Sequence, residues 1–525
     1  MYNKGLFCDW VPKPVQLLLI LIFLLIILPV SGIYIGNISD MTGSLGSLAE
    51  EISMASNAGT IGMAVVFPLL LRTKAYFRSK ELITGSLLLM AMFNMVCGTT
   101  DNTSLLLISS FLIGFLKMFA MIEVLLPVMF MLSPNGDRGR FYSIFYPLSI
   151  ALGQLLGYWT TVLAASLRWQ QAYLFIAMLL LGAAMLALVF MHNLRSAKKV
   201  PMYYFDWLSL VLLSVALLSL NYGLVYGRQQ QWFESVKLQG FSAIFVLSLA
   251  IFIKRQMLLK RPYLPLGVFI KKNVYNAVLM IFLMGMFVAS GSVQSVFTSG
   301  VLGYDAVTNA SLNLLIIPGI ILGAITAFIW FKKKWWLKPL VLLGFGAYQV
   351  YAVYMYFLIA PVVEIEMFIF PSVLKGFGMC VLFIAIGFYM ADTLPMSQML
   401  SASTVMIVTR SFIGPAFFGA VFAWAQYKVQ WQQATQLAGQ MEGLSTQTSN
   451  ALITYGAVQV QAILNTVKEI YGYVIMAGWV ILLYITLHRF RPLHRRKLIL
   501  MRKKWRYGES VEGYQLSGKP VASTV

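Results

Sequence analysis

Four ionisable residues of this sequence, Lys117, Glu123, Lys375 and Arg410, stand deep inside long apolar stretches. A charge in the hydrocarbon core of a membrane is costly, so such residues generally face a cavity or one another and mark the path of an ion or ligand. Glu123 is the one carboxylate that we place well inside such a stretch. Because intramembrane carboxylates form proton relays, Glu123 is the candidate for proton coupling.

The three basic residues predict an anion-binding function. With a single acid beside them they leave an excess of positive charge, which an anion, a deprotonated amine or a water-filled cavity must relieve. Lys117, Lys375 and Arg410 are therefore candidates for holding the anionic group of an anionic or zwitterionic amphipathic molecule. Structural explanations stay open. Glu123 could pair with a nearby basic residue or reach water, and Arg410 could bond backbone carbonyls between helices.

A second set of candidates consists of uncharged polar side chains within the apolar stretches. Each of them could line a cavity, or it could simply form a hydrogen bond with a neighbouring helix. The set comprises Asn37, Asn57, Gln154, Gln294 and Asn313.

The composition indicates what kind of element must position these residues. Of the 525 residues 59% are hydrophobic and 11% are charged, and the mean hydropathy is +0.79. Soluble domains carry about 25% charged residues. Apolar runs of about 20 residues, enough for one helix to cross a bilayer, recur along the whole chain. The runs are continuous and do not alternate as barrel strands do. The predicted fold class is an all-α polytopic membrane protein.

We expect fourteen transmembrane helices. The first six span residues 15–36, 50–71, 82–100, 104–132, 141–165 and 170–191. Two more span 207–227 and 236–253, and the last six span 274–299, 306–331, 339–360, 367–390, 398–424 and 469–488. The connections are short, apart from a Gln-, Thr- and Ser-rich outer loop at 425–468.

The distribution of basic residues supports this topology. With the N-terminus in the cytoplasm, 31 of the 39 Lys and Arg residues fall in inner segments, five in outer loops and three within helices. Such a bias is the positive-inside pattern. It accounts for the net charge of +21 without a nucleic-acid partner. The basic tail, residues 491–525, is expected in the cytoplasm, either solvated or lying along the membrane surface.

An internal repeat is visible at an offset of about 260 residues, which suggests the paired halves common in secondary transporters. Ser110–Phe115 resembles Ser372–Phe377, and Gly153 with Gly157 parallels Gly414-Pro415 with Gly419. The expected organisation is a six-helix half at 1–200, an inserted helix pair at 201–260, a second six-helix half at 261–490 and the tail at 491–525.

Several stretches, taken in order, resemble the major facilitator superfamily, and more narrowly its fourteen-helix drug:proton antiporter family. They are LRWQQAYLF at 167–175, FDWL at 205–208, RPYLPLGVF at 261–269 and TRSFIG at 409–414. The loop after the second helix keeps the family's basic residues Arg72, Arg78 and Lys80 but lacks its Asp. Gly153-Gln154 stands where that family has Gly-Pro, and Val30 stands where it has an acid.

The resemblance implies a major-facilitator-type fold with a central cavity between the halves. Helices one, four, nine and twelve would line it, with two, five, ten and thirteen beside them. All four intramembrane charges fall on this set. Residues of the two glycine motifs and of the basic loop would then serve gating: Gly153, Gly157, Gly414, Pro415, Arg72, Arg78 and Lys80.

The function implied by the resemblance is secondary active transport of small amphipathic molecules by alternating access, as proton-coupled efflux of the multidrug type. Uptake or exchange of an organic anion without proton coupling is the alternative, and a non-transport membrane protein is the remaining one. The proton gradient would supply the energy, with no cofactor. The expected location is the cell (inner) membrane, with both termini cytoplasmic.

An enzymatic role is not expected. The three histidines, His192, His488 and His494, lie near helix ends, and no carboxylate dyad, nucleophile arrangement or metal-ligand spacing accompanies them. The expected partners are a small-molecule substrate and membrane lipid. Efflux partners in the periplasm or outer membrane are left open.

Overall fold

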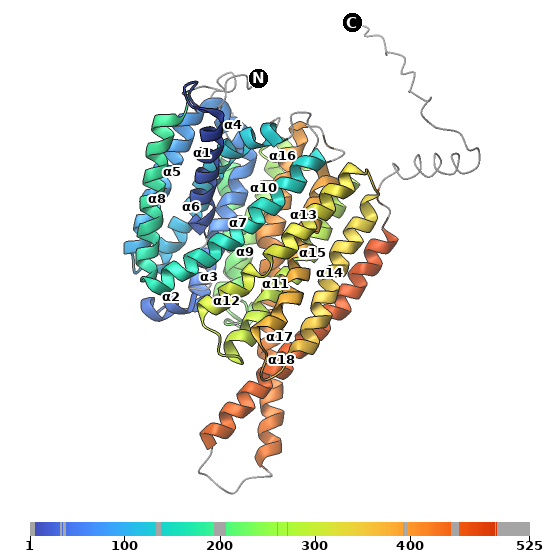
Figure 1. Cartoon of the computed structure of the whole chain (residues 1–525). Coiled ribbons are helices and arrows are strands. Elements are labelled where there is room, and N and C mark those ends of the chain that lie inside the picture. The colour runs from blue at the N-terminus through green and yellow to red at the C-terminus, as the bar shows by residue number, and fades with distance from the viewer. Residues whose placement is uncertain are drawn as a thin grey trace, which may run out of the picture.

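The computed structural model describes residues 6–31, 34, 38–132, 138–193, 206–259, 261–269, 271–391, 394, 396–442, 451–488 and 490. These residues form helices joined by short connections, with no strand of a sheet among them (Figure 1). Fourteen helical segments are long and apolar enough to cross a membrane. The predicted class, an all-α multi-pass membrane protein with fourteen transmembrane helices, is confirmed.

The first six spans form one bundle. The first is built from α1 (Lys13–Ile27) and the short 3-10 turn η1 (Leu28–Ser31), with α2 (Ile38–Leu45) after it. The others are α3 (Ala49–Val66), α5 (Ser79–Thr99), α6 (Thr103–Leu132), α7 (Arg138–Ser166) and α8 (Trp169–Phe190), with α4 (Leu70–Tyr76) extending α3. Their buried apolar residues make one core.

The last six spans form a second bundle with its own core. They are α11 (Lys272–Gly300), the pair α12 (Ala306–Leu314) and α13 (Ile317–Lys332), α14 (Leu337–Leu358) and α15 (Ile369–Ala391). The thirteenth span joins α16 (Met396–Val408), the π-helical turn η7 (Thr409–Ile413) and α17 (Gly414–Glu442), and α18 (Ala451–Leu487) is the last.

The inserted pair, α9 (Trp207–Tyr226) and α10 (Val236–Leu258), packs against both bundles. Leu210 and Leu217 of α9 share a third core with Ile61 of α3 and Phe412 of η7. At the start of α9 the Asp206 carboxylate accepts the Ser209 N–H, which satisfies one of the free amides of the first turn.

The internal repeat has a structural counterpart at two glycines. A side chain on Gly114 of α6 would collide with the carbonyl oxygen of Gly59 on α3. Its repeat partner Gly376 of α15 lies in the same way against the carbonyl of Ile316, which precedes α13. Each glycine lets two helices of its own bundle cross with their backbones in contact, as small residues do in membrane bundles. The exact domain boundaries stay a prediction.

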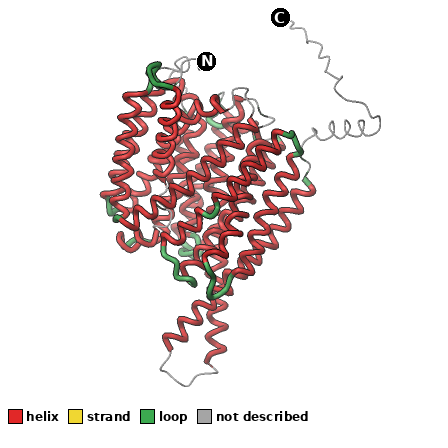
Figure 2. The backbone as a smooth tube through the Cα atoms, in the orientation of Figure 1, coloured by secondary structure: helices red, strands yellow, loops and turns green. Residues whose placement is uncertain are grey.

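The segment expected as a long outer loop is mostly helical instead. α17 runs on to Glu442 and α18 begins at Ala451, so a two-helix projection leaves the bundle at the end opposite the start of α1 (Figures 1 and 2). Asn465 donates to the Gln433 side chain across the pair. Gln and Ala are good helix formers, so a polar composition here does not oppose helix formation. We refer to the end with the projection as the outer end and to the other as the inner end, following the predicted topology.

Candidate functional site

A cavity of about 500 Å³ lies where the two bundles meet. Gln154 of α7 is the residue of the first bundle in its lining, and the other lining residues come from α11, α12, α15 and α17 of the second bundle and from Ile316, which precedes α13. The structure brings five of the candidate site residues predicted from the sequence into its lining: Gln154, Gln294, Asn313, Lys375 and Pro415. A cavity of this size suits a drug-sized molecule.

Lys375 is the charged residue of this lining. Its ammonium lies 5.4 Å from the centre of the Tyr351 ring, a cation–π contact, and its side chain is half-buried. A Cβ added at Gly291 would come within 3.0 Å of the Lys375 nitrogen, so the ammonium lies directly against the backbone of α11. The lining contains no Asp or Glu. In the described part of the chain, Lys375 forms no ion pair.

Tyr351 connects Lys375 to a second polar group of the cavity. Its hydroxyl donates to Gln294 Oε1 at 3.1 Å and lies 3.2 Å from the hydroxyl of Tyr471. Tyr471 in turn reaches the carbonyl of Ser290 at 3.3 Å. Both tyrosines are fully buried. This pair was not predicted from the sequence, because a tyrosine in an apolar helix is generally a packing residue.

Arg410 lies outside the cavity lining, in an aromatic cage. Its guanidinium carbon is 4.6 Å from the ring centre of Phe383 on α15 and 5.5 Å from that of Tyr146 on α7. Arg410 stands in the π-helical turn η7, just before Gly414-Pro415. Single π turns within helices are frequent at functional sites. Gly414 packs backbone to backbone against Gly285 of α11, whose added Cβ would lie 2.7 Å from Gly414 Cα.

Lys117 binds the backbone where the helix of the first span changes from α1 to η1. Lys117 is buried, with 5% of the residue exposed. Its ammonium donates a hydrogen bond to the carbonyl oxygen of Leu28 at 2.7 Å. Leu28 is the cap at which α1 passes into η1. A cation at the carboxyl end of a helix stabilises the free carbonyls there. The structure therefore places Lys117 against the backbone of α1 and does not place it in the cavity lining.

Glu123 is fully buried in α6 and forms an ion pair with Lys74 of α4, with 2.9 Å between Oε2 and the ammonium nitrogen. Its other oxygen, Oε1, has no hydrogen-bond partner among the described residues. The partner was missed from the sequence, where Lys74 counted only as a basic residue of the inner loop. The signal that could have identified this partner was the abundance of Lys and Arg in that loop, directly after a membrane helix.

The other candidates are dispersed. Asn57 donates to Asn221 of α9 at 2.9 Å, which joins α3 to the inserted pair. Arg72 donates to the carbonyl of Pro262 at 3.2 Å, and Arg78 lies 3.8 Å from Glu81, with Lys80 beside it in the first turn of α5. Gly153 and Gly157 lie in the middle of α7, and Asn37 and the tail at 491–525 fall outside the described residues.

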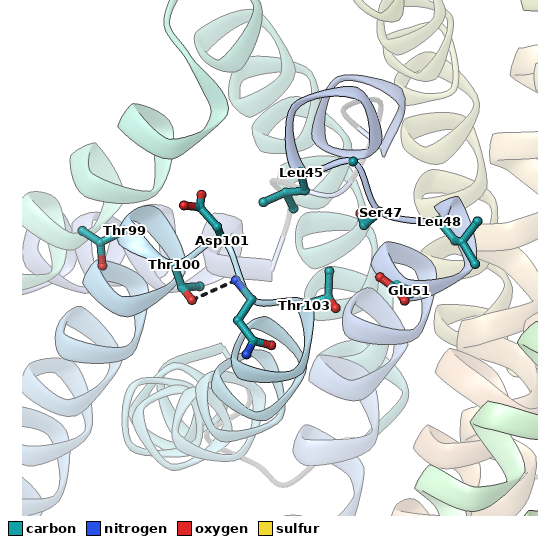
Figure 3. A pocket seen from close by; sticks show the side chains of 10 residues that line it. Leu45, Ser47, Leu48, Glu51, Thr99, Thr100, Asp101 and Thr103 are labelled. Carbon is teal, nitrogen blue, oxygen red and sulfur yellow. Dashed lines mark hydrogen bonds between the residues drawn. The ribbon is translucent and has the colours of Figure 1, made fainter.

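A second, wider pocket of about 730 Å³ opens at the outer end of the first bundle (Figure 3). The turns α2–α3 and α5–α6 form it, and Glu51 and Asp101 are its charged residues. None of the residues predicted from the sequence lines this pocket. Its polar, acidic lining makes it distinct in chemistry from the cavity at Lys375.

The chain was compared with known protein families and proteins. No protein-family model matches the chain. The colistin resistance protein EmrB of Acinetobacter baumannii is 20% identical over 404 residues, which cover 74% of this chain and 76% of that protein.

Three solved structures share the arrangement of helices. A POT family transporter in complex with a thioalcohol-conjugated peptide has a TM-score of 0.58 at 13% identity, covering 90% of this chain and 96% of that one. The nucleoside transporter NupG has a TM-score of 0.52 at 11% identity, covering 90% and 100%. A bacterial homologue of the human lysosomal transporter Spinster, in an inward-facing, occupied conformation, also has a TM-score of 0.52, at 12% identity, covering 90% and 96%.

Proposed function

Because the chain has the fold of the major facilitator superfamily, as its sequence resemblance predicted, we propose that it is a secondary active transporter of small amphipathic molecules that works by alternating access. The observation that carries the proposal is the cavity at the junction of the two bundles, to whose lining the first bundle contributes Gln154 and the second contributes Lys375. A site shared by two bundles is the one that their rocking exposes to each side of the membrane in turn.

Proton-coupled efflux is the form of transport that we favour. Glu123 supports it, because an intramembrane carboxylate with one oxygen bound to Lys74 can exchange that bond for a proton. Protonation would neutralise the carboxylate and release the ammonium, loosening α4 from α6 at the inner end. The distant relationship to a resistance protein is consistent with export.

The second candidate is uptake or exchange of an organic anion without proton coupling. The position of Glu123 favours it, because this carboxylate lies outside the cavity lining and is already neutralised by Lys74. In that case the ion pair would hold the inner end of the bundle together in every step of transport.

Reconstituted protein distinguishes the two candidates. We would measure flux of three aromatic probes of similar size, toluenesulfonate, toluenesulfonamide and benzyltrimethylammonium, into proteoliposomes with and without a pH gradient. The charge of the sulfonate and of the quaternary amine is fixed, so the gradient cannot drive them through the lipid by protonation. Coupled transport predicts accumulation that disappears when the gradient is collapsed and in Glu123→Gln. Accumulation that persists in Glu123→Gln would remove Glu123 from the coupling mechanism.

The matched control is Glu81→Gln, which removes an exposed carboxylate at the same end of the protein. Flux that ignores the gradient in the wild type would favour the second candidate. Absence of flux for every probe, in protein that inserts and unfolds cooperatively, would count against transport of small amphipathic molecules.

A further inference from the structure

We propose that the cavity selects monoanionic amphipathic molecules, whose anionic group binds to Lys375 and Gln294 while Tyr351 positions both. This inference rests on the proposed function, because it takes the cavity to be the transport site. It assigns one ligand charge to one place in the cavity and identifies a positioning residue that does not line it.

The charge of the cavity is the first step. Its lining holds one lysine and no acid, and Lys375 forms no ion pair within the described ranges. Lys117 and Glu123, in contrast, are already engaged, with Leu28 and Lys74. A half-buried ammonium without a counter-ion is costly, and a bound anion removes this cost. One positive charge is best matched by one negative charge.

The second step is the arrangement around the ammonium. The Tyr351 ring lies beneath it at 5.4 Å, and the Tyr351 hydroxyl holds Gln294 Oε1 at 3.1 Å. With its oxygen engaged, the Gln294 amide has its N–H donors left for a ligand. An anionic group beside Lys375 would then receive one charged and one neutral hydrogen bond. Because Tyr351 is fully buried, it fixes both donors from behind the cavity wall.

The third step is the shape and polarity of the remaining wall. Gly291 leaves the space that the ammonium occupies, so the charge lies at the α11 side of the cavity. Val288, Leu312, Ile316 and Met379 supply apolar surface in the same lining. A ligand that fits must therefore carry its charge at one end and an apolar body at the other. Met is an adaptable contact for such a body.

Binding measurements on purified protein test the charge preference directly. Toluenesulfonate and toluenesulfonamide have nearly the same shape and differ in charge, and benzyltrimethylammonium reverses the charge. We expect the sulfonate to bind at least about tenfold more tightly than the sulfonamide, since a hydrogen bond to a charged group is stronger than a neutral one. Lys375→Gln should remove this preference, and Lys375→Arg should retain much of it.

The control variant is Lys428→Gln. Lys428 also lies over an aromatic ring, 4.8 Å from the centre of Trp424, but on the outer projection away from the cavity. It should leave the preference intact. Equal binding of sulfonate and sulfonamide to the wild type, binding of neither, or a preference that survives Lys375→Gln would each overturn the proposal.

Tyr351→Phe tests the positioning role, because it keeps the ring under the ammonium and removes the hydroxyl. We expect the sulfonate preference to fall about threefold or more, the size of one neutral hydrogen bond. In the Gln294→Ala background the same substitution should have no further effect, since the amide it positions is gone. An equal effect of Tyr351→Phe in both backgrounds would show that the hydroxyl acts on the protein as a whole, and would overturn this assignment.

The outcomes separate this inference from the proposed function. Selective binding of toluenesulfonate without flux in proteoliposomes supports the anion site and contradicts transport of this class. Flux of all three probes without any charge preference supports transport and contradicts the anion site.

Discussion

Lys74 and Glu123 lie 49 residues apart in the chain, yet their charged groups meet at 2.9 Å in the interior of the first bundle. The pair fastens the short helix α4 to α6 near the inner end. Both side chains are buried, so the attraction is weakly screened, but each charge has also lost its hydration. Such a pair contributes little net stability when complete, and its disruption is costly.

Removal of one partner of this pair should therefore destabilise the protein. We expect Glu123→Gln to lower the free energy of unfolding by about 3–5 kcal/mol, because the ammonium then remains buried without its carboxylate. Thermal and denaturant unfolding of the purified protein would measure this. The double variant Lys74→Met with Glu123→Gln should recover most of the loss, since neither charge remains. A double variant as unstable as the single one would show that the pair is not the cause.

The start of the inserted pair should respond to acid. Partial burial raises the pKa of Asp206, but hydrogen bonds from Ser209 and from Arg255, at 2.9 Å, outweigh this and hold the pKa below its ordinary 3.8. The contribution of this carboxylate to stability is thus complete above pH 3.8 and is lost as the pH falls through the lowered pKa.

The expected result is a loss of thermal stability in this acid range that Asp206→Asn abolishes. Asparagine still caps α9 but carries no charge, so the variant should be less stable at neutral pH by up to about 1 kcal/mol and insensitive to this titration. Differential scanning calorimetry of both proteins from about pH 6 to about pH 3 would measure this difference in thermal stability. An unchanged acid response in the variant would assign the effect to other carboxylates.

The helices themselves were largely predictable from the sequence, because continuous apolar runs and the distribution of Lys and Arg report directly on membrane crossing. The resemblance placed Lys375 on a helix expected to line the cavity, whereas for Gln294 a place in the cavity and a hydrogen bond to a neighbouring helix both stayed open. The Lys74–Glu123 pair and the Tyr351–Gln294 bond were not predictable, because they depend on how two helices rotate against each other. The outer projection was missed because a polar composition fits both a loop and a solvated helix.

The matched glycines of the two bundles should be equally intolerant of a side chain. Gly114→Ala and Gly376→Ala each place a methyl group against a backbone carbonyl that cannot move aside, so we expect each to cost about 1–3 kcal/mol of stability. Gly182→Ala on α8 is the control, because nothing lies within 4 Å of its added Cβ. Thermal unfolding would measure all three. Because alanine is the better helix former, Gly182→Ala should not lower stability, and a loss of the same size there would show that the close crossing is not the cause.

Tyr146 makes one of the contacts between the two bundles. It belongs to α7 of the first bundle, yet its side chain is buried in the core of the second, against Phe383 and the Arg410 guanidinium. A Cβ added at Gly387 would lie 3.3 Å from the Tyr146 ring, so α15 is shaped to receive it. Along α7, Tyr146 lies closer to the inner end than Gln154 of the cavity lining, so this contact lies on the inner side of the cavity.

Tyr146→Ala should therefore increase access to the cavity from the inner end. The substitution removes the cation–π contact with Arg410 and much of the buried ring area, which together should shift the equilibrium about threefold or more toward the inward-open state. Labelling of Gln154→Cys by a membrane-impermeant maleimide, in protein whose Cys8, Cys97 and Cys380 are replaced by Ser and in vesicles that expose the inner end, reports this access. Tyr146→Phe keeps the ring and should label at nearly the wild-type rate. If Tyr146→Ala leaves the labelling rate unchanged, the inner closure depends on contacts other than this one.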